Sequence, residues 1–326
     1  MTRRLPVGVV GVGALGRHHA RHLAALEEAE LVGVYDLDPA RAAEIAIELG
    51  TTAFADLDAL HGRGEAVTVA VPTPAHAAVG LQALERGIPV LMEKPLAATV
   101  AEADALIAAA ARGGLQLQVG HIERYNRALR AAEPYLDGPR YIESQRLAPF
   151  QPRGTDVAVV LDLMIHDLDL VLRLTGGAEA TEVRASGLAL LSSHLDIANA
   201  RVEFSSGAVA LATASRVSRE RVRRLRLFQP NGYLSLDLAS GGGEFMRVRS
   251  DWRPGTGSAL TDVVERVVLE APEADALQLE LRSFVHAVRG EREVVVTGEE
   301  GRSALALALR VADAVRTSPL AVPTAG

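Results

Sequence analysis

The chain has 326 residues, of which 48% are hydrophobic, and its formal net charge is −7. This length suits two domains better than one core, and the excess of acidic residues argues against nucleic acid as the main partner. The lack of cysteine excludes disulfides, thiolate metal sites and a cysteine nucleophile, and no apolar run reaches the roughly 18 residues of a membrane span. We expect a cytoplasmic protein, because the first strand begins too close to Met1 to leave room for a cleavable signal peptide.

The first predicted element is a buried strand that leads into a glycine-rich turn. The apolar run at 7–10 precedes a G-x-G-x-x-G motif, and a helix follows from Arg17. In such a turn the first glycine permits the bend, the second lets the backbone approach a pyrophosphate, and the third lets the helix pack against its strand. The helix N-terminus then offers N–H groups to the phosphates. We therefore predict that the cofactor contacts Gly11, Gly13, Ala14, Leu15 and Gly16.

Asp36 directly follows the next apolar run, 31–35. An acid about twenty residues after the last glycine is placed to accept hydrogen bonds from the adenosine ribose hydroxyls, and it repels a 2′-phosphate. NAD is therefore favoured over NADP as the cofactor. Arg41, one turn into the following helix, leaves the use of both cofactors open.

Short apolar runs continue to alternate with helix-like segments over the first 120 residues. The strand-like runs lie at 66–71, 89–93 and 115–119. This alternation predicts a doubly wound parallel sheet, so residues 1–121 are expected to form an N-terminal Rossmann domain in an α/β protein. We expect the segment after the first of these runs to border the nicotinamide half of the cofactor through Pro72, Thr73, Pro74 and His76.

The pattern changes to period two in the second predicted domain, residues 122–326. Strand-like runs at 199–204 and 208–215 flank Ser205-Ser206-Gly207, and shorter runs flank the hairpin signal Asn231-Gly232. Helices are predicted at 155–174, 275–289 and 299–316, and the terminal helices could pack back on the first domain. We expect an α+β domain on a large, mostly antiparallel open sheet, which binds substrate and forms a homodimer or homotetramer through the sheet.

Lys94 lies in Glu93-Lys94-Pro95, directly after a predicted parallel strand. Ligands of open α/β sheets bind beyond the carboxyl ends of the strands, so Glu93 and Lys94 are expected beside the cofactor. Lysine there can donate to a substrate hydroxyl and stabilise developing alkoxide charge. A cis bond before Pro95 would aim the ammonium, although Lys-Pro is also an ordinary way to end a strand.

Asp162 and His166 are four residues apart in the helix predicted at 155–174. On one helical face the carboxylate could fix the imidazole tautomer, and histidine is the natural proton acceptor near neutral pH. Acids such as Asp167 and Asp169 in an otherwise apolar helix are costly to bury without a purpose. A partly exposed helix end is the alternative. A metal site at His166 lacks further ligands, and none is predicted.

Charged and polar residues after the last Rossmann strand are candidates for binding substrate or for packing between domains. They are His121, Glu123, Arg124, Tyr125 and Asn126. Arg153 and Arg216 are candidates for holding substrate anions. The basic run at 216–226 is either a solvated strand face or an anion site for a phosphorylated substrate such as a sugar nucleotide.

These motifs together resemble the glucose–fructose oxidoreductase, inositol dehydrogenase and MocA (Gfo/Idh/MocA) family over nearly the whole chain. The residues that carry the resemblance are the glycine turn, Asp36, Pro72-Thr73-Pro74-Ala75-His76, Glu93-Lys94-Pro95 and the Asp-x-x-x-His helix. The family's catalytic group implies Lys94, Asp162 and His166 here. The segments 120–126 and 214–218 further resemble the branch that contains UDP-N-acetylglucosamine 3-dehydrogenases, although Arg127 replaces the proline expected there.

The resemblance implies NAD-dependent oxidation of a secondary hydroxyl of a sugar or sugar nucleotide, with the 3-hydroxyl of UDP-N-acetylglucosamine as the first candidate. His166, oriented by Asp162, would accept the hydroxyl proton, and Lys94 would donate to the same oxygen while hydride passes to nicotinamide. The alternatives are an inositol or free-sugar dehydrogenase, an NAD-dependent glycosidase or lyase, and a non-catalytic dinucleotide sensor. A G-x-S-x-G nucleophile elbow is absent.

Overall fold

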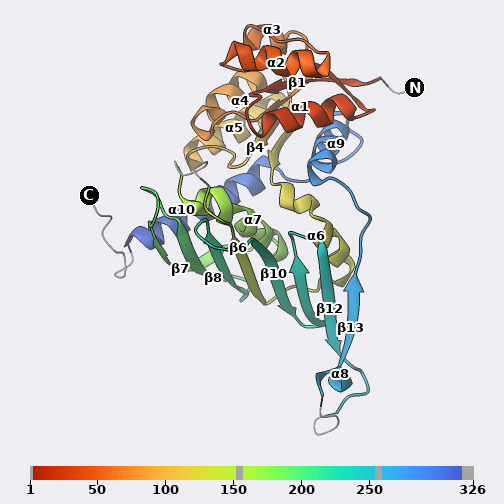
Figure 1. Ribbon diagram of the computed structural model, residues 1–326, viewed down its shortest axis with the longest axis vertical. Coiled ribbons are helices and arrows are strands. Elements are labelled where there is room, and N and C mark those ends of the chain that lie inside the picture. Colours follow the sequence, from red (N-terminus) through yellow and green to blue (C-terminus); the bar gives the residue numbers. More distant parts are fainter. Residues whose placement is uncertain (1–2, 152–156, 254–258, 318–326) are drawn as a thin grey trace. The chain divides into compact units, whose positions relative to one another are not determined.

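The computed structural model describes residues 3–151, 157–253 and 259–317. They form two units, each described by itself (Figure 1). The first comprises Met1–Ile122 and Ala274–Leu305, and the second comprises Glu123–Glu273 and Ala306–Gly326. Besides the expected division near residue 121, the chain thus returns to the first unit late in the sequence.

The first unit contains a five-stranded sheet in the order β2-β1-β3-β4-β5, in which all described neighbours pair in parallel. This confirms the predicted doubly wound α/β sheet. The strands are β1 (Leu5–Val10), β2 (Ala29–Tyr35), β3 (Ala66–Val69), β4 (Val90–Glu93) and β5 (Leu117–Gly120). The helices among them are α1 (Gly16–Ala25), α2 (Pro39–Leu49), α3 (Leu57–His61), η1 (Thr73–Ala75), α4 (His76–Glu85) and α5 (Val100–Gly113).

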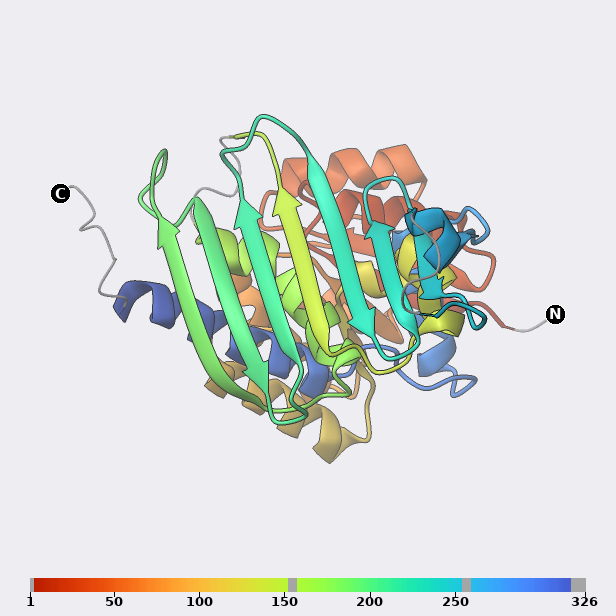
Figure 2. The ribbon, with the colours of Figure 1, turned by 90° about the horizontal axis from the view of Figure 1, so that it is seen from below.

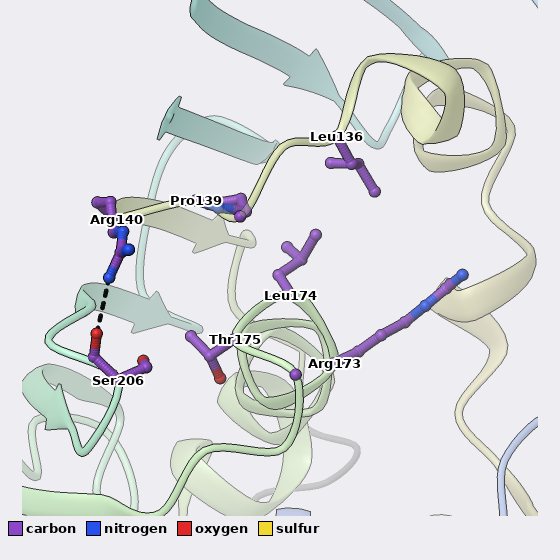
Figure 3. A pocket seen from close by; sticks show the side chains of 9 residues that line it. Leu136, Pro139, Arg140, Arg173, Leu174, Thr175 and Ser206 are labelled. Atoms are coloured by element: carbon purple, nitrogen blue, oxygen red, sulfur yellow. Dashed lines mark hydrogen bonds between the residues drawn. The ribbon is translucent and has the colours of Figure 1, made fainter. Parts of the chain in front are cut away.

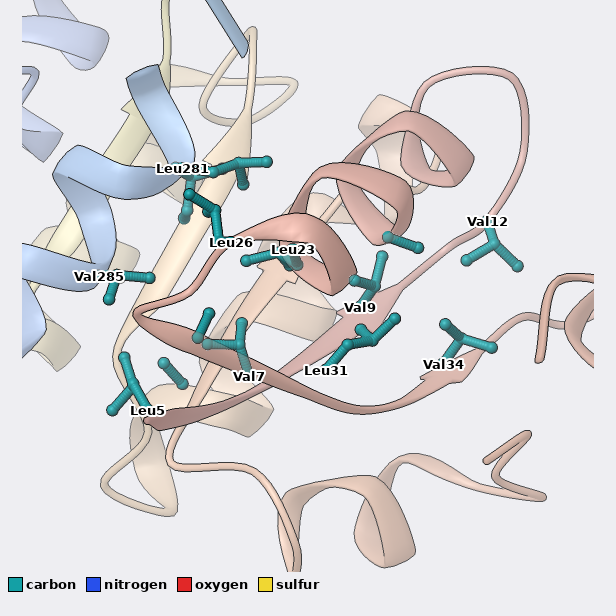
Figure 4. Close-up of a cluster of buried hydrophobic side chains, with 14 of the residues drawn as sticks. Leu5, Val7, Val9, Val12, Leu23, Leu26, Leu31, Val34, Leu281 and Val285 are labelled. Carbon is teal, nitrogen blue, oxygen red and sulfur yellow. The ribbon is translucent and has the colours of Figure 1, made fainter. Parts of the chain in front are cut away.

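The core of this unit includes a helix from late in the sequence. Val7 and Val9 of β1 pack with Leu23 of α1, and all three side chains are inaccessible to solvent. Leu281 and Val285 of α9 (Ala276–Val288) join the same cluster, as Figure 4 shows. Burying these apolar side chains supplies the main stabilisation of the unit, so α9 completes the nucleotide-binding fold.

The second unit is built on an eight-stranded sheet in the order β13-β12-β11-β10-β6-β9-β8-β7 (Figure 2). Its described neighbours are antiparallel except for the parallel pair β6 and β9, which confirms a large, mostly antiparallel sheet. The strands are β6 (Tyr141–Leu147), β7 (Ala180–Leu188), β8 (Ile197–Phe204), β9 (Val209–Ser215), β10 (Val222–Gln229), β11 (Gly232–Asp237), β12 (Gly242–Val248) and β13 (Val264–Leu269).

The sequence pattern did not predict β6, which lies near the middle of the sheet. Its inward face carries Ser144 and Arg146 beside Ile142, and all three are buried. Polar residues on the buried face erase the alternation of apolar and polar residues by which a strand is identified. The buried guanidinium of Arg146 needs a carboxylate partner, and this partner, Asp167, comes from a helix of the same unit.

Helices cover one face of the sheet. A π-helical turn, η4 (Val160–Met164), leads into α7 (Ile165–Leu174), which packs against β6 and β9, while α6 (Arg127–Ala132) packs near β11 and β12. The predicted single helix at 155–174 is therefore two segments, and its start lies partly outside the described residues. The remaining elements are η2 (Ile122–Tyr125), η3 (Glu133–Tyr135), α8 (Leu260–Val263) and α10 (Gly298–Thr317). None of the helices in the described ranges is long and apolar enough to cross a membrane.

Candidate active site

The three glycines of the turn after β1 have distinct surroundings. Gly11 has φ +82° and donates its N–H to the Tyr35 carbonyl at 2.7 Å. A Cβ at Gly16 would lie 1.7 Å from the Gly11 carbonyl oxygen, whereas a Cβ at Gly13 would have no heavy atom within 4 Å. Neither crowding nor a left-handed backbone requires glycine at position 13. The missing side chain leaves open space, which fits the approach of a pyrophosphate.

The N-terminus of α1 offers backbone donors to that space. No side chain of the described residues caps α1, and its first turn has no acid. By contrast, Asp38 caps α2 by accepting from the N–H of Ala40 at 3.0 Å, and Thr99 caps α5. Free N–H groups and the positive end of the helix dipole favour an anion, so the residues present fit a dinucleotide phosphate.

Asp36 is held rigidly at the end of β2. Its Oδ2 accepts from the Val12 N–H at 2.8 Å, and its Oδ1 accepts from the Asp38 N–H at 2.9 Å. The guanidinium of Arg41 lies 3.3 Å from Asp36 Oδ1 and 3.5 Å from Asp38 Oδ2. The fixed carboxylate is suited to accept hydrogen bonds from the adenosine ribose hydroxyls. The guanidinium of Arg41 places one positive charge beside this carboxylate.

Glu93, Lys94 and Pro95 form a turn at the carboxyl end of β4, and the predicted cis bond between Lys94 and Pro95 is present. Glu93 Oε1 lies 2.9 Å from Nε2 of His19 on α1, and Oε2 accepts from the Lys94 N–H at 3.1 Å. Burial alone raises the pKa of Glu93, but hydrogen bonding and charge from His19 and the charge of Lys94 outweigh it, so the pKa lies below its ordinary value. Glu93 is therefore an ionised acceptor.

His76 lies on the other side of this turn. Its Nδ1 is 2.8 Å from the Pro95 carbonyl oxygen, and its Nε2 is 2.9 Å from the Val71 carbonyl oxygen. Burial lowers the pKa of His76 against the effect of these carbonyls. The ring of His76 is buried, and its two nitrogens face backbone carbonyl oxygens. By contrast, Pro72 and Pro74 are exposed and Thr73 is half-buried. The contact between His76 and the cofactor stays a prediction.

Lys94 is the only lysine of the chain; the other 33 of its 34 basic residues are arginines. This count can be read from the sequence and singles out Lys94 without any motif. Lysine and arginine are not interchangeable, because an ammonium is a compact charge that can lose its proton while a guanidinium stays protonated. The single lysine thus lies where proton-linked chemistry was predicted.

Asp162 and His166 belong to the second unit. Asp162 lies on the π-helical turn η4 and His166 on the first turn of α7; both are half-buried, while Met164 and Ile165 between them are fully buried. π-Helical turns occur often at functional sites. Lys94 belongs to the first unit, so its placement beside this pair stays a prediction.

Asp167 and Asp169 have structural partners. Arg146 Nε and Nη2 donate to the two oxygens of Asp167, each at 2.9 Å, and Arg124 donates to those of Asp169 at 2.6 and 2.8 Å. Burial alone lowers the pKa of Arg146, but the charges of Asp167 and of Glu123 outweigh it and raise the pKa. These two forked ion pairs explain the acids in the helix, and they fix α7 against β6 and η2.

Two of the residues predicted to face substrate or to pack between domains have their ion-pair partners within the second unit. Glu123 Oε1 accepts from Arg146 Nη1 and Oε2 from Asn126 Nδ2, both at 2.8 Å, and Arg124 is 3% exposed in its pair with Asp169. His121 and Tyr125 are buried as well, while Asn126 is half-buried. Contacts of this segment with substrate stay a prediction.

The predicted anion-binding arginines also differ in their surroundings. Arg153 lies outside the described residues. Arg216 is buried; it donates to the Leu195 carbonyl at 3.0 Å and to that of Val157, and its Nε lies 3.5 Å from Asp196 Oδ1. Arg216 therefore holds the chain before β8 in place.

Arg223 was overlooked as a separate candidate. It pairs across strands with Arg146, so it points to the same inward face, and its side chain is 41% exposed. Arg223 Nη1 lies 3.6 Å from Glu123 Oε1. Its strand neighbour Arg224 faces the other side of the sheet, as the alternation with buried Leu225 dictates.

The cavity in Figure 3, of about 450 Å³, lies at the C-terminal end of α7 and is lined by Leu136, Arg140, Arg173 and Ser206, among others. Asp162 and His166 lie at the opposite end of the same helical segment, so this cavity is not the candidate site. Within the ranges that the structure describes, no three His, Asp or Glu residues are grouped to hold a metal ion.

Two family models match the chain. One, described as an oxidoreductase family with an NAD-binding Rossmann fold, matches residues 5–121, and the Gfo/Idh/MocA C-terminal domain matches residues 134–235. A UDP-N-acetylglucosamine 3-dehydrogenase of Acidithiobacillus ferrooxidans is 41% identical over 94% of this chain and 96% of its own length. Its solved structure, named GnnA, has a TM-score of 0.90 and covers 96% of this chain and 98% of that one.

The chain is also similar to a dehydrogenase named for another substrate and to a more distant solved structure. Myo-inositol dehydrogenase Hyg17 of Streptomyces leeuwenhoekii is 32% identical over 76% of this chain and 83% of its own length. The structure of GenD2 from gentamicin A biosynthesis, solved with NAD, is 22% identical with a TM-score of 0.81 over 97% of this chain and 95% of that one. At that identity the likeness shows a shared fold.

Proposed function

The chain belongs to the Gfo/Idh/MocA family of oxidoreductases, which bind NAD in a Rossmann fold, and we propose that it oxidises the 3-hydroxyl of UDP-N-acetylglucosamine. The observation that carries this proposal is the likeness to a UDP-N-acetylglucosamine 3-dehydrogenase, which extends through both units. The open space at Gly13, the uncapped start of α1 and the fixed carboxylate of Asp36 would hold NAD. Bound there, NAD supplies the acceptor of the two electrons removed from the substrate carbon.

His166 acts as the base in the proposed reaction. Oxidation of a secondary alcohol needs a group that accepts the hydroxyl proton, and an imidazole does so near neutral pH. Asp162, on the preceding π-helical turn, is proposed to orient the imidazole and to stabilise it once protonated. The ion pairs of Asp167 with Arg146 on β6 and of Asp169 with Arg124 on η2 hold the helix of His166 in place.

Lys94 donates to the hydroxyl oxygen in this proposal. The ammonium stabilises the negative charge that grows on the oxygen as the proton leaves, and a preorganised donor is worth most at that point. We propose that Lys94, Asp162 and His166 converge on the same substrate carbon. A glycosidase or lyase of the same fold would return the electrons within each turnover, whereas a dehydrogenase releases one NADH for each ketone formed.

Arg223 would bind the diphosphate of the sugar nucleotide. Its guanidinium is half-exposed on the inward face, and the nearby carboxylate of Glu123 already accepts from Arg146 at the shorter distance of 2.8 Å. Inositol dehydrogenation is the second candidate, favoured by the likeness to Hyg17. A neutral cyclitol needs no such cation, so the substrate preference of an Arg223 variant separates the two candidates.

The test measures NADH formation with UDP-N-acetylglucosamine, free N-acetylglucosamine and myo-inositol. We expect turnover with the sugar nucleotide, and reduction of its product with borodeuteride should place deuterium at carbon 3. Lys94→Ala and His166→Ala should each abolish turnover while leaving NAD binding intact. Turnover of myo-inositol alone would refute the substrate proposal, and near wild-type rates in both variants would refute the catalytic assignment.

We further propose that the protein works as a homodimer or homotetramer that pairs through the sheet face opposite α7, in the cytoplasm. Tyr141, Phe228 and Tyr233 form an aromatic row there, with ring centroids 5.6 and 4.7 Å apart, and Phe228 is 40% exposed. Exposed aromatic side chains are enriched at interfaces. Sedimentation of the wild type and of Phe228→Glu tests the assembly, which the charge should weaken.

A further inference from the structure

The turn that carries Lys94 is held on both sides by a buried histidine. His19 contacts the residue before Lys94, and His76 contacts the residue after it. Both rings are 1% exposed, and all of these residues belong to the first unit. His19 has no other role in the proposed reaction, and both ring nitrogens of His76 face backbone carbonyls, so their shared target needs an explanation.

His19 acts through Glu93. Its Nε2 lies 2.9 Å from Glu93 Oε1, while Oε2 of the same carboxylate accepts the Lys94 N–H at 3.1 Å. The carboxylate therefore ties the backbone of Lys94 to α1, the helix that follows the glycine turn. A Cβ at Gly120 would lie 3.3 Å from the Glu93 carboxyl carbon, so β5 leaves the space that the carboxylate fills.

His76 acts on the other side of Lys94. One ring nitrogen reaches the Pro95 carbonyl at 2.8 Å, and the other reaches the Val71 carbonyl at 2.9 Å. A neutral imidazole carries one N–H, so the ring donates to one of these carbonyls, and in the Nδ1–H tautomer that carbonyl is the one of Pro95 in the Lys94 turn. With both contacts in place, the backbone at 93–95 has fixed partners from α1 and from α4.

Lys94 needs such support more than an arginine would. Its ammonium is a point charge on a flexible four-carbon stem, without the planar fork that pre-organises a guanidinium. The placement of the amine therefore depends on where the backbone of residue 94 is held. A displacement of about 1 Å in a catalytic group can cost about a hundredfold in rate.

We propose that His19, through Glu93, and His76, through the Pro95 carbonyl, are positioning residues for the ammonium of Lys94. This inference rests on the proposed function, in which Lys94 is catalytic. The competing explanation is that both histidines only stabilise the Rossmann fold. The two explanations differ in what happens at Lys94 when a variant is still folded.

The single lysine makes the test direct, because one ε-amine in the whole chain reports on this turn alone. The rate at which acetic anhydride acylates Lys94 is measured by peptide mapping, which separates it from the N-terminal amine. We expect His19→Leu and His76→Leu to raise this rate about threefold to tenfold, as the loss of one hydrogen bond would. His19→Gln keeps a donor toward Glu93, so its rate should stay near that of the wild type.

His61→Leu is the matched control. His61 is also a buried histidine of the first unit, and neither of its ring nitrogens has a hydrogen-bond partner among the described residues. This substitution replaces a buried imidazole by leucine without breaking a hydrogen bond, so the acylation rate of Lys94 should stay at the wild-type value. If His19→Leu does not fold, His19→Asn replaces it, since the shorter amide does not reach Glu93.

A kinetic arm separates this inference from the proposed function. His19→Leu should lower kcat about tenfold, as a displaced catalytic group would, with little change in NAD affinity by calorimetry, whereas His61→Leu should leave kcat unchanged. If Lys94→Ala itself keeps full turnover, the proposed function is wrong, and acylation alone decides the inference. Acylation rates of His19→Leu and His76→Leu equal to that of His61→Leu would overturn it.

Discussion

The substitution Gly13→Ala tests whether glycine is needed at position 13 to bind a ligand or to form the fold. A Cβ at Gly13 meets no heavy atom within 4 Å, and φ of Gly13 lies outside the left-handed region. Alanine fits such a site and restricts the unfolded chain, so the free energy of unfolding should stay equal or rise by about 0.4–1 kcal/mol. A glycine that served only the fold would show the opposite sign.

The same substitution should weaken NAD binding, because the new methyl group would occupy the space that we assign to the pyrophosphate. A loss of about 2 kcal/mol raises the dissociation constant roughly thirtyfold. It should also remove most of the increase in Tm that NAD gives the wild type, since that increase depends on ligand concentration relative to Kd. Calorimetry gives the affinity, and denaturant unfolding without NAD gives the stability.

Gly16→Ala is the matched comparison, since its Cβ would lie 1.7 Å from the Gly11 carbonyl oxygen. This variant should lose stability whether or not NAD is present. The reasoning fails if Gly13→Ala binds NAD within about twofold of the wild type, or if it destabilises the apoprotein as much as Gly16→Ala does.

Three further predictions concern charged groups of the second unit. Arg146→Met leaves Asp167 buried without its cation and should cost about 3–5 kcal/mol in urea unfolding; a loss below about 1 kcal/mol would contradict the forked ion pair. Arg223→Met should raise KM for the sugar nucleotide about tenfold or more and leave stability nearly unchanged, and an equal KM would exclude a phosphate contact. Backbone N–H groups and Ser192 lower the pKa of Asp196 to about 2 despite its burial. Because this folded pKa is depressed, the stability it contributes, about 2 kcal/mol, is present above about pH 4 and is lost as the pH falls through about 2. Unfolding of Asp196→Asn should lack that part of the acid dependence, and parallel acid profiles would contradict it.

Much of the first unit could be predicted from the sequence, because its signals are local. The glycine turn, Asp36 and the alternation of strands and helices lie close together in the chain, and each follows from short-range geometry. The sequence left open whether the terminal helices pack back on the first domain, and it did not identify the core residues that α9 contacts. An amphipathic helix shows which face it buries, but not which partner it buries that face against.

The partners of the acids on α7 were hidden for a related reason. A buried carboxylate signals that a cation lies nearby, but the cation can come from any part of the chain. Asp167 takes Arg146 from β6, and Asp169 takes Arg124 from η2. The pattern of residues could indicate a purpose for these acids, and the fold was needed to separate a structural purpose from a catalytic one. The π-helical turn at Asp162 has no local sequence signal at all.

The arginines and the single lysine of this chain also differ between a structural role and a proposed catalytic role. Arg124 and Arg146 are buried in forked ion pairs with carboxylates, for which the planar guanidinium is suited. In these positions a group that stays protonated is an advantage, because an uncharged partner would leave a carboxylate buried alone. The single lysine lies instead at the carboxyl end of β4, on a turn fixed by two histidines. In the reaction that we propose, this one lysine side chain meets an oxygen whose charge changes during turnover, which is a task for an ammonium that can exchange its proton.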